Sequence, residues 1–396
     1  MCKPTAGWDK KYRFLEWVPF DRFTDIKEIG EGGFAKVYSV TWVDGNSEYY
    51  ENDESWGKNE PRTITVALKK LSGSQNMSDK YLNELKIHWE ISKKAGLEFY
   101  GLTKWPETKE FMMIIQFANE GNLRNILSNN FNNIMWKSKM DRLCSMVVDL
   151  KNLHQLGYCH KDFHSGNILR ANATFLSDFG LSGPANEQKS DGKVYGVMPY
   201  IAPEVLNREP YTSSSDIYSF GVVMAELSSG KPPFYNKKHD LSLALAICNG
   251  LRPEFGKGTP EFYKKLAYKC MNANPNERPT AKELYNIFSF WDSSIEGDKD
   301  NKEEYGYKGN EIKAAFEEAN KEIPNISTSY EKNSDAVFTS RAFTFGNLLP
   351  KPVNSSLITS YVNNEVCDSQ LIDLEVSNSI QLRDIDDESK VDDLVN

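Results

Sequence analysis

YCHKDFHSGNILRANATFLSDFG, residues 158–180, is the most informative part of this sequence. It contains an H-x-D-x-x-x-x-N run at 160–167, which lies eleven residues ahead of a DFG tripeptide at 178–180. A lone DFG arises easily by chance, and its aspartate would then be an ordinary turn residue. Two motifs in this order and at this spacing are much rarer, so together they indicate a functional site.

The residue types in these two motifs suit phosphoryl transfer. Transfer from ATP to a hydroxyl needs a carboxylate that orients the hydroxyl and accepts its proton, and oxygen ligands that hold Mg²⁺ against the phosphates. Asp162 suits the first task, and Asn167 and Asp178 suit the second. In these motifs the sequence resembles the eukaryotic protein kinase family. The resemblance implies a two-lobed, α+β protein-kinase-like fold, with a small antiparallel β lobe plus one helix, a large, mainly helical lobe, and ATP and Mg²⁺ as cofactors.

Composition and charge divide the chain into a folded part and a tail. Of 396 residues, 39% are hydrophobic, which is enough for a substantial core. Residues 291–396 hold 10 Lys/Arg and 22 Asp/Glu, whereas 1–290 hold 37 and 34. The near-neutral first part lacks the basic excess of a nucleic-acid-binding protein, so no nucleic-acid partner is expected.

Targeting signals are not evident in the sequence. The six cysteines show no CxxC pairing or metal-ligand spacing, which indicates a reduced, cytoplasmic protein, with import into the nucleus left open. The start lacks an apolar signal region, and no apolar run reaches the roughly 20 residues of a membrane span. We therefore expect no membrane association.

The pattern along the chain predicts three parts. Residues 1–23 form an N-terminal extension, 24–290 the kinase domain, and 291–396 an acidic, mostly disordered tail. Within the domain, the small lobe covers about 24–118, including a polar surface insert at 44–62, and the large lobe about 119–290. In the tail, the spacing of Ile312, Phe316 and Ala319 predicts one short helix, and 336–350 is more apolar than its surroundings. Either stretch could dock onto a partner or back onto the kinase domain, but the composition favours a solvated tail with a nascent helix.

A glycine-rich turn and a lysine strand follow the kinase order in the small lobe. Gly30, Gly32 and Gly33 let backbone amides approach phosphates, and Val37 would cover the adenine. Ala35 stands where the family places its third glycine. Taken alone, such a turn is equally well explained as a plain hairpin.

The V-A-x-K pattern in a β-branched strand selects Lys69, with Ala67 near the adenine. The resemblance implies that Lys69 contacts the α and β phosphates and pairs with Glu84, fifteen residues later, on a helix predicted over 78–94. Leu82 and Leu85 would form part of the buried stripe of this helix.

The resemblance also places the hinge and the structural residues of the large lobe. Ile115 would be the gatekeeper, and the hinge would include Gln116 and Ala118. The residues expected to hold the scaffold together are His160 near the DFG turn, Asp216 beneath the catalytic loop, and a buried ion pair of Glu204 with Arg278.

Four departures bear on regulation and substrate. Lys161 replaces an arginine that grips a phosphorylated activation loop, Ala35 replaces a glycine, and His164 and Val197 match neither the serine/threonine nor the tyrosine pattern. The tyrosine-kinase-like group fits best, and its members mostly phosphorylate serine and threonine. The candidate phosphosites of the activation segment are Ser182, Ser190 and Tyr195.

Two hypotheses of different class follow from these motifs. The first is an active kinase that phosphorylates a protein substrate, and the second is a catalytically silent pseudokinase scaffold that binds partners. The second draws support only from the four departures, because every residue that handles ATP or Mg²⁺ is present.

Overall fold

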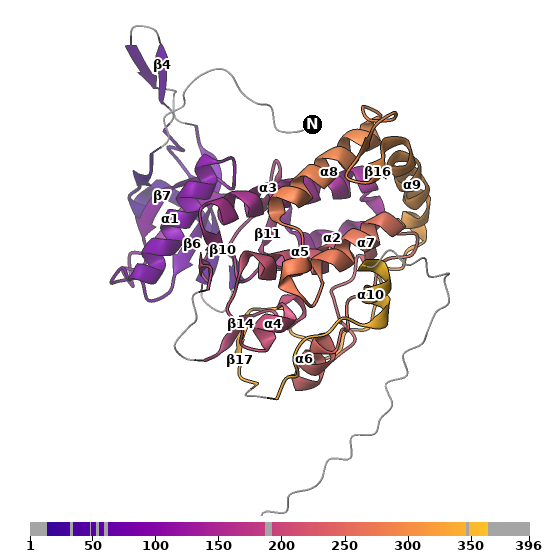
Figure 1. Ribbon diagram of the computed structural model, residues 1–396. Coiled ribbons are helices and arrows are strands. Elements are labelled where there is room, and N and C mark those ends of the chain that lie inside the picture. Colours follow the sequence, from indigo (N-terminus) through magenta and orange to yellow (C-terminus); the bar gives the residue numbers. More distant parts are fainter. Residues whose placement is uncertain are drawn as a thin grey trace, which may run out of the picture.

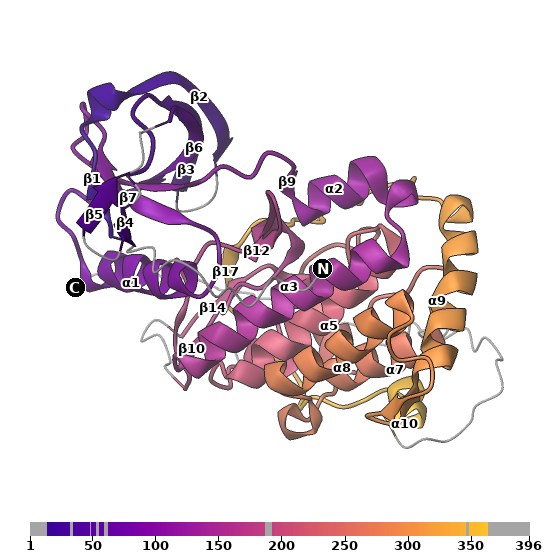
Figure 2. The same cartoon turned by 90° about the horizontal axis from the view of Figure 1, so that it is seen from above.

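The computed structural model describes residues 14–31, 35–47, 49–52, 55–58, 62–186, 192–345 and 348–362. Figures 1 and 2 show a small lobe of strands with one helix beside a larger lobe of helices. The predicted two-lobed α+β fold is confirmed.

A six-stranded sheet forms the small lobe. Its order is β1 (Glu16–Trp17), β7 (Phe99–Lys104), β8 (Phe111–Gln116), β6 (Ile64–Leu71), β3 (Ala35–Trp42) and β2 (Phe23–Glu31). All neighbours are antiparallel except β1 and β7. Along β3, Tyr38, Val40 and Trp42 alternate into the core with the period of two that a strand imposes.

Helix α1 (Asp79–Lys93) contacts this sheet and the large lobe. The helix predicted over 78–94 is present, but its buried face differs from the predicted stripe. Leu82 is 51% exposed, whereas Ile87, His88 and Ile91 are buried. The difference arises because Glu84 faces inward to meet Lys69, which turns Leu82 toward solvent.

Helix α5 (Ser213–Ser229) is the centre of the large lobe, and 14 of its 17 residues are buried. A capping box of Thr212 and Ser215 begins it, and Gly230, with φ of 72°, ends it in the left-handed conformation that glycine tolerates. The other helices of this lobe are α2 (Leu123–Asn130), α3 (Trp136–Gln155), α4 (Pro203–Leu206), α6 (Leu241–Cys248), α7 (Glu261–Cys270) and α8 (Ala281–Glu296).

Short strands position the loops between the lobes. They are β9 (Gly121–Asn122), β10 (Tyr158–Cys159), β11 (Ile168–Arg170), β12 (Thr174–Leu176), β13 (Gly183–Pro184) and β14 (Val194–Gly196). The antiparallel β11–β12 hairpin brings Asn167 and Asp178 to the same end of the strand pair. Asn167 directly precedes β11, and Asp178 follows the end of β12 by two residues.

Part of the N-terminal extension packs on this sheet, whereas the insert forms a separate two-stranded sheet. Val18 is buried, and the Trp17 ring lies edge-on to Phe111 at 6.1 Å. Within the insert, β4 (Tyr49–Asn52) and β5 (Ser55–Lys58) form a hairpin that extends away from the small lobe in Figure 1.

The C-terminal segment differs from the predicted disordered tail over its described residues. It contains β15 (Glu303–Glu304), β16 (Tyr307–Lys308), α9 (Gly309–Glu322), β17 (Arg341–Phe343) and α10 (Ser356–Val362). Ile312, Phe316 and Ala319 are buried, because the aromatic surface of α3 and α8 offers their apolar stripe a place to pack. Residues 363–396 lie outside the described part of the chain.

Candidate active site

Lys69 joins the small lobe to the start of the DFG tripeptide. Its Nζ lies 2.6 Å from Glu84 Oε1 on α1 and 2.8 Å from Asp178 Oδ1. Lys69 and Glu84 are 7% and 4% exposed, so both charges are held in an environment that screens them little. The structure thus brings together three residues that lie far apart in the sequence.

The charges of this trio fix their protonation. Partial desolvation of Asp178 would raise its pKa, but the Lys69 ammonium beside it outweighs this effect and lowers the pKa to about 2. Burial would lower the pKa of Lys69, but the carboxylates of Asp178 and Glu84 raise it above its usual value. Lys69 is therefore cationic and Asp178 anionic at neutral pH.

The catalytic loop places Asp162 beside Asn167. The Nδ2 group of Asn167 donates to the backbone oxygen of Asp162 at 3.0 Å and to its Oδ2 at 3.3 Å. The Oδ1 atom of Asp162 is buried and has no hydrogen-bond partner among the described residues, although His164 Nε2 lies 3.6 Å away. A buried carboxylate oxygen in this state is available to accept a proton from an incoming group.

Asp216 holds the backbone of this loop from below. Its carboxylate accepts from the amides of His160 at 2.8 Å and Lys161 at 3.0 Å, and His154 Nε2 lies 2.9 Å away. Lys161 adopts a φ of 66°, a conformation that non-glycine residues avoid unless the surroundings impose it.

His160 connects the loop to the DFG turn. Its Nδ1 accepts from the amide of Asp162 at 3.2 Å, so the proton sits on Nε2, which donates to the Ser177 oxygen at 3.0 Å. Burial lowers its pKa, which favours this neutral form. The ring centroids of His160 and Phe179 lie 5.5 Å apart. The ring of His88, on α1, makes a T-shaped contact with Phe179 at a centroid distance of 5.3 Å. The motifs gave no signal for His88, because its role depends on packing.

A buried ion pair anchors the end of the activation segment. Glu204 accepts from both terminal nitrogens of Arg278 at 2.7 Å, and Ser215 donates to the same carboxylate at 3.1 Å. The structure thus pairs the two residues that the sequence predicts to pair.

The predicted adenine surface lies between the lobes. Ala67 faces Ile115 across the β6–β8 pair, and both belong to one apolar cluster with Val37 and Leu169. Leu169, on β11, was not predicted. The backbone N–H of Gln116 donates to the backbone oxygen of Glu98 at 2.9 Å, and the backbone oxygen of Ala118 accepts from the N–H of Gly121 at 3.0 Å.

Gly30 pairs with Val37 at the tip of the β2–β3 hairpin. Gly32 and Gly33 lie outside the described residues, so their predicted role in holding phosphates is left as a prediction.

Comparison with known proteins identifies the family. A family model described as protein tyrosine and serine/threonine kinase matches residues 23–288. The chain belongs to this protein kinase family. The predicted membership of the eukaryotic protein kinases is therefore confirmed.

Relatives of the kinase differ in the substrate class that their names state. A Dictyostelium discoideum protein named as a probable serine/threonine-protein kinase is 28% identical over 71% of this chain and 16% of its own length. Tyrosine-protein kinase TXK of Homo sapiens is 27% identical over 72% of this chain and 50% of its own length. Serine/threonine-protein kinase 4 homolog A of Dictyostelium discoideum is 26% identical over 66% and 54%. The chain thus spans about half or less of the length of these relatives.

The candidate phosphosites of the kinase lie in different surroundings. Ser182 is buried and donates to the His160 oxygen at 3.1 Å, so its hydroxyl supports the loop. Tyr195 is partly buried on β14, and Ser190 lies outside the described residues. The burial of Ser182 argues against modification while the loop is in this conformation.

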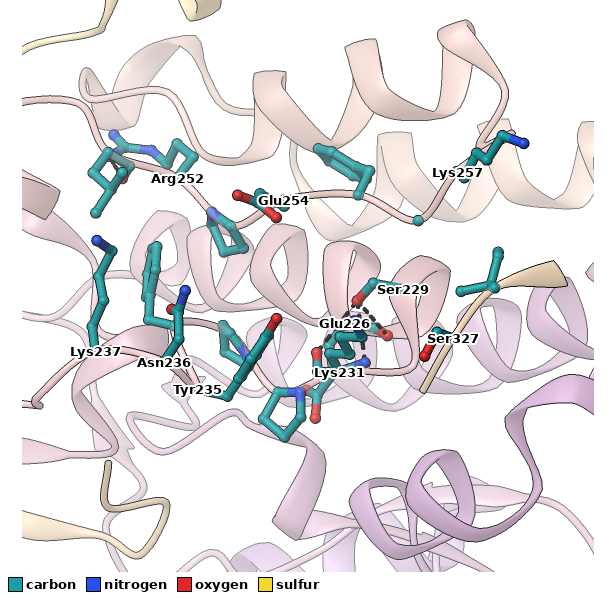
Figure 3. A pocket seen from close by; sticks show the side chains of 18 of the residues that line it. Glu226, Ser229, Lys231, Tyr235, Asn236, Lys237, Arg252, Glu254, Lys257 and Ser327 are labelled. Atoms are coloured by element: carbon teal, nitrogen blue, oxygen red, sulfur yellow. Dashed lines mark hydrogen bonds between the residues drawn. The ribbon is translucent and has the colours of Figure 1, made fainter. Parts of the chain in front are cut away.

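Among the cavities formed by the described residues, two lie in the large lobe of the kinase. One, of about 420 Å³, opens between the loop after α5, the segment 251–257 and residues 325–327 of the C-terminal segment (Figure 3). In Figure 3, Tyr235 and Lys237 come from the first of these and Arg252 and Lys257 from the second. The other, of about 230 Å³, is lined by the activation segment and by Lys161.

Within the described residues, no helix is both long and apolar enough to cross a membrane. Four cysteines there, Cys144, Cys159, Cys248 and Cys270, form no disulfide with one another.

Proposed function

We propose that this chain transfers the γ-phosphoryl group of ATP to a hydroxyl of a protein substrate, serine or threonine in preference to tyrosine. The observation that carries the proposal is that Lys69 contacts Asp178 at 2.8 Å, while His160 links the Asp162 amide to the Ser177 oxygen, next to Asp178. In this family such an arrangement serves phosphoryl transfer by positioning and electrostatics.

Lys69 is the residue that would bind the phosphates. Its ammonium is held by Glu84 from α1, so it is pre-oriented and stays charged. A pre-positioned cation stabilises phosphate charge without reorganisation during the reaction.

Asn167 and Asp178 would hold Mg²⁺, which supplies positive charge against the phosphates. The two side chains fit this task. The Asp178 carboxylate is ionised and its side chain is 48% exposed, and the Asn167 amide donates its NH₂ to Asp162, which leaves the amide oxygen for a cation. No group of three or more metal-ligating acids, histidines or cysteines occurs among the described residues. Mg²⁺ in such sites relies on one or two protein ligands plus the phosphates.

Asp162 would orient the acceptor hydroxyl and take its proton. Its Oδ1 has no hydrogen-bond partner in the described structure, and its other oxygen is fixed by Asn167. A fixed carboxylate with one free oxygen presents the acceptor in a single direction.

Two observations support the preference for serine and threonine. The activation segment lacks the proline–tryptophan pair of dedicated tyrosine kinases, and two of the relatives above are named serine/threonine-protein kinases. The thiols of Cys159, Cys248 and Cys270 are buried and form no disulfide, which fits a reducing cytoplasm, where we place the activity.

The test is to incubate the full chain with ATP and Mg²⁺ and to map phosphosites by mass spectrometry, with Asp178→Asn as control. Phosphoserine or phosphothreonine that depends on Asp178 is the expected result. Phosphotyrosine alone would overturn the preference. Absence of transfer to the chain and to generic substrates would favour the pseudokinase scaffold instead.

A further inference from the structure

A strand of the C-terminal segment pairs with the activation segment. β17 runs antiparallel to β14, with Phe343 opposite Val194, Ala342 opposite Tyr195 and Arg341 opposite Gly196. The two strands form a sheet of their own, and Figure 1 shows them side by side near α4. An extended peptide that adds a strand to a free edge is a general mode of peptide recognition.

This pairing ends beside Asp162. A Cβ atom built on Gly196 would lie 3.5 Å from Asp162 Oδ1, so the backbone opposite Arg341 approaches the proposed proton acceptor directly. Continuing the antiparallel register by one residue brings Ser340 opposite Val197. Ser340 thus immediately precedes β17, at the end of the strand pair that lies nearest Asp162.

Separate contacts hold residues 336–345, which we call the docked segment. His239 lies just before α6, and its Nδ1 is 2.9 Å from the backbone oxygen of Val337 and 3.1 Å from the Val337 amide nitrogen. The backbone oxygen of His239 accepts from the Arg341 guanidinium at 2.6 Å. Arg124, on α2, donates to the Phe338 oxygen at 2.8 Å, and its guanidinium lies 5.0 Å from the Phe338 ring.

Apolar burial fixes both ends of the docked segment. Ala336, Phe343 and Phe345 are 1%, 8% and 9% exposed, and the two phenylalanine rings stack at 5.6 Å. Upstream, the Tyr330 ring lies 4.6 Å from that of Tyr235, which lines the cavity of Figure 3. The segment therefore follows one continuous path over the large lobe to β14.

Ser340 and Asp162 each carry a buried oxygen without a hydrogen bond in the described part of the chain. These atoms are Ser340 Oγ and Asp162 Oδ1. Buried polar atoms are nearly always satisfied, so each such exception requires an explanation. Neither oxygen hydrogen-bonds to the other in this structure, but a hydroxyl that needs an acceptor and a carboxylate that accepts protons are chemically complementary.

We infer that the docked segment occupies the groove for the protein substrate within the same molecule, and that Ser340 is the phosphoacceptor it presents to Asp162. The inference rests on the proposed kinase activity. It adds a modification site and identifies an extended peptide with an apolar side chain three residues after the acceptor, as at Phe343, as the class of substrate that the groove accepts.

The transfer step balances with ATP as the second reactant. Ser340 Oγ forms a bond to the γ-phosphorus, the bond from that phosphorus to the β–γ bridging oxygen breaks, and ADP leaves. The hydroxyl proton passes to Asp162. The products are ADP and phosphoserine at 340.

Occupation in cis has two measurable consequences. Phosphorylation of Ser340 is first order in protein, so its rate constant does not change on dilution by about a hundredfold. Added peptide substrates compete with a tethered segment, so their phosphorylation is slow until the segment leaves the groove.

The decisive experiment mixes active full-length chain with isotope-labelled Asp162→Asn chain in ATP and Mg²⁺ and locates phosphate by mass spectrometry. We expect Ser340 to be phosphorylated on the active chain alone. Ser340→Ala should abolish this site, whereas Thr339→Ala, at the adjacent exposed residue, should retain it. Equal phosphate on Ser340 of the inactive chain would overturn transfer in cis.

A second variant tests occupation of the groove. Phe343→Asp puts a charge where a buried ring packs and should release the segment, raising phosphorylation of an added peptide roughly tenfold or more. Leu348→Asp, at a residue 64% exposed, is the matched control and should change nothing. Amide hydrogen exchange at 194–196 should accelerate only in Phe343→Asp.

The outcomes separate the two proposals. Phosphorylation of the added peptide without phosphate on Ser340, and without a gain in Phe343→Asp, overturns this inference and leaves the kinase activity intact. Absence of transfer to any acceptor overturns the proposed function and transfer in cis with it. Unchanged amide exchange in Phe343→Asp contradicts occupation of the groove whatever the activity.

Discussion

Lys69 contacts two carboxylates from different lobes, and at neutral pH Lys69 is cationic and Asp178 anionic. We expect Lys69→Met to remove the phosphate contact and to abolish measurable transfer.

Asp162→Asn should lower kcat by roughly 10²–10⁴-fold, the usual contribution of a general base. The rate of phosphoryl transfer from ATP to a defined peptide measures both effects.

The fold should survive the Asp162 substitution, because asparagine keeps the shape of the side chain. Circular dichroism and the thermal midpoint are the controls. Undiminished transfer in Asp162→Asn would refute the role assigned to this carboxylate.

Glu204 and Arg278 form the second residue-scale test. Arg278→Ala leaves a buried carboxylate without its cation, and we expect the free energy of unfolding to fall by about 3–5 kcal/mol. Urea denaturation measures the change. Lys321→Ala, in an exposed pair with Glu318, should leave stability unaltered, and a similar loss in both variants would contradict the argument.

At this scale the sequence predicted the charged pairs well, because spacing and residue type carry them. Glu84 was identified from its interval to Lys69, and the structure joins the two. His88 and Leu169 were not found, because their contacts with Phe179 and the adenine surface depend on packing between distant elements. Leu82 was placed on the wrong face of its helix for the same reason: a buried glutamate determined the rotation of α1.

Helix α3 buries a lysine. Lys139 is 0% exposed, its Nζ lies 4.1 Å from the Phe131 ring centroid, and it has no hydrogen-bond partner among the described residues. Burial, with a smaller effect from the Arg142 charge, lowers the pKa of Lys139 from 10.5 to about 7. Between these values the unfolded chain binds a proton that the folded chain has lost, so this group makes stability rise with pH from about 7 to 10.5.

Lys139→Met should therefore stabilise the chain near neutral pH, and its advantage over the natural chain should shrink toward pH 10. Denaturant titrations near pH 7 and pH 10 measure the two differences. Lys257→Met, at a side chain 79% exposed, should show no such trend. An advantage that is constant with pH would mean that Lys139 titrates normally.

Helix α9 covers an aromatic surface of the large lobe. The Phe316 ring lies 5.2 Å from those of Trp136 and Phe262 and is 1% exposed. We expect Phe316→Ala to lower the free energy of unfolding by about 3–5 kcal/mol, because it removes buried area and leaves a cavity. Urea denaturation, with the 53% exposed Tyr305→Ala as control, measures the loss. Equal stability of the two variants would show that α9 is not part of the cooperative unit.

Over the whole molecule, the lobes were predictable and the path of the C-terminal segment was not. Acidic composition favoured disorder after residue 290, whereas Phe343 and Phe345 are buried against elements about 150 residues earlier in the chain. A short apolar stretch in a polar segment carries no information about which surface will bind it. The strand pairing with β14 could therefore be found only in three dimensions.

ATP with Mg²⁺ would bridge the two lobes, since Lys69 and Ala67 lie on β6 and Asn167 and Asp178 flank β11 and β12. A ligand that binds only the folded state stabilises it by about 2.7 kcal/mol at a hundred times its dissociation constant. We therefore expect saturating ATP with Mg²⁺ to raise the thermal midpoint by several degrees. Lys69→Met should weaken this shift. Phe343→Asp should retain it, because the docked segment pairs with β14, whereas the proposed nucleotide contacts are made by Lys69 and Asp178. Loss of the shift in Phe343→Asp would instead mean that the segment and the nucleotide share one site.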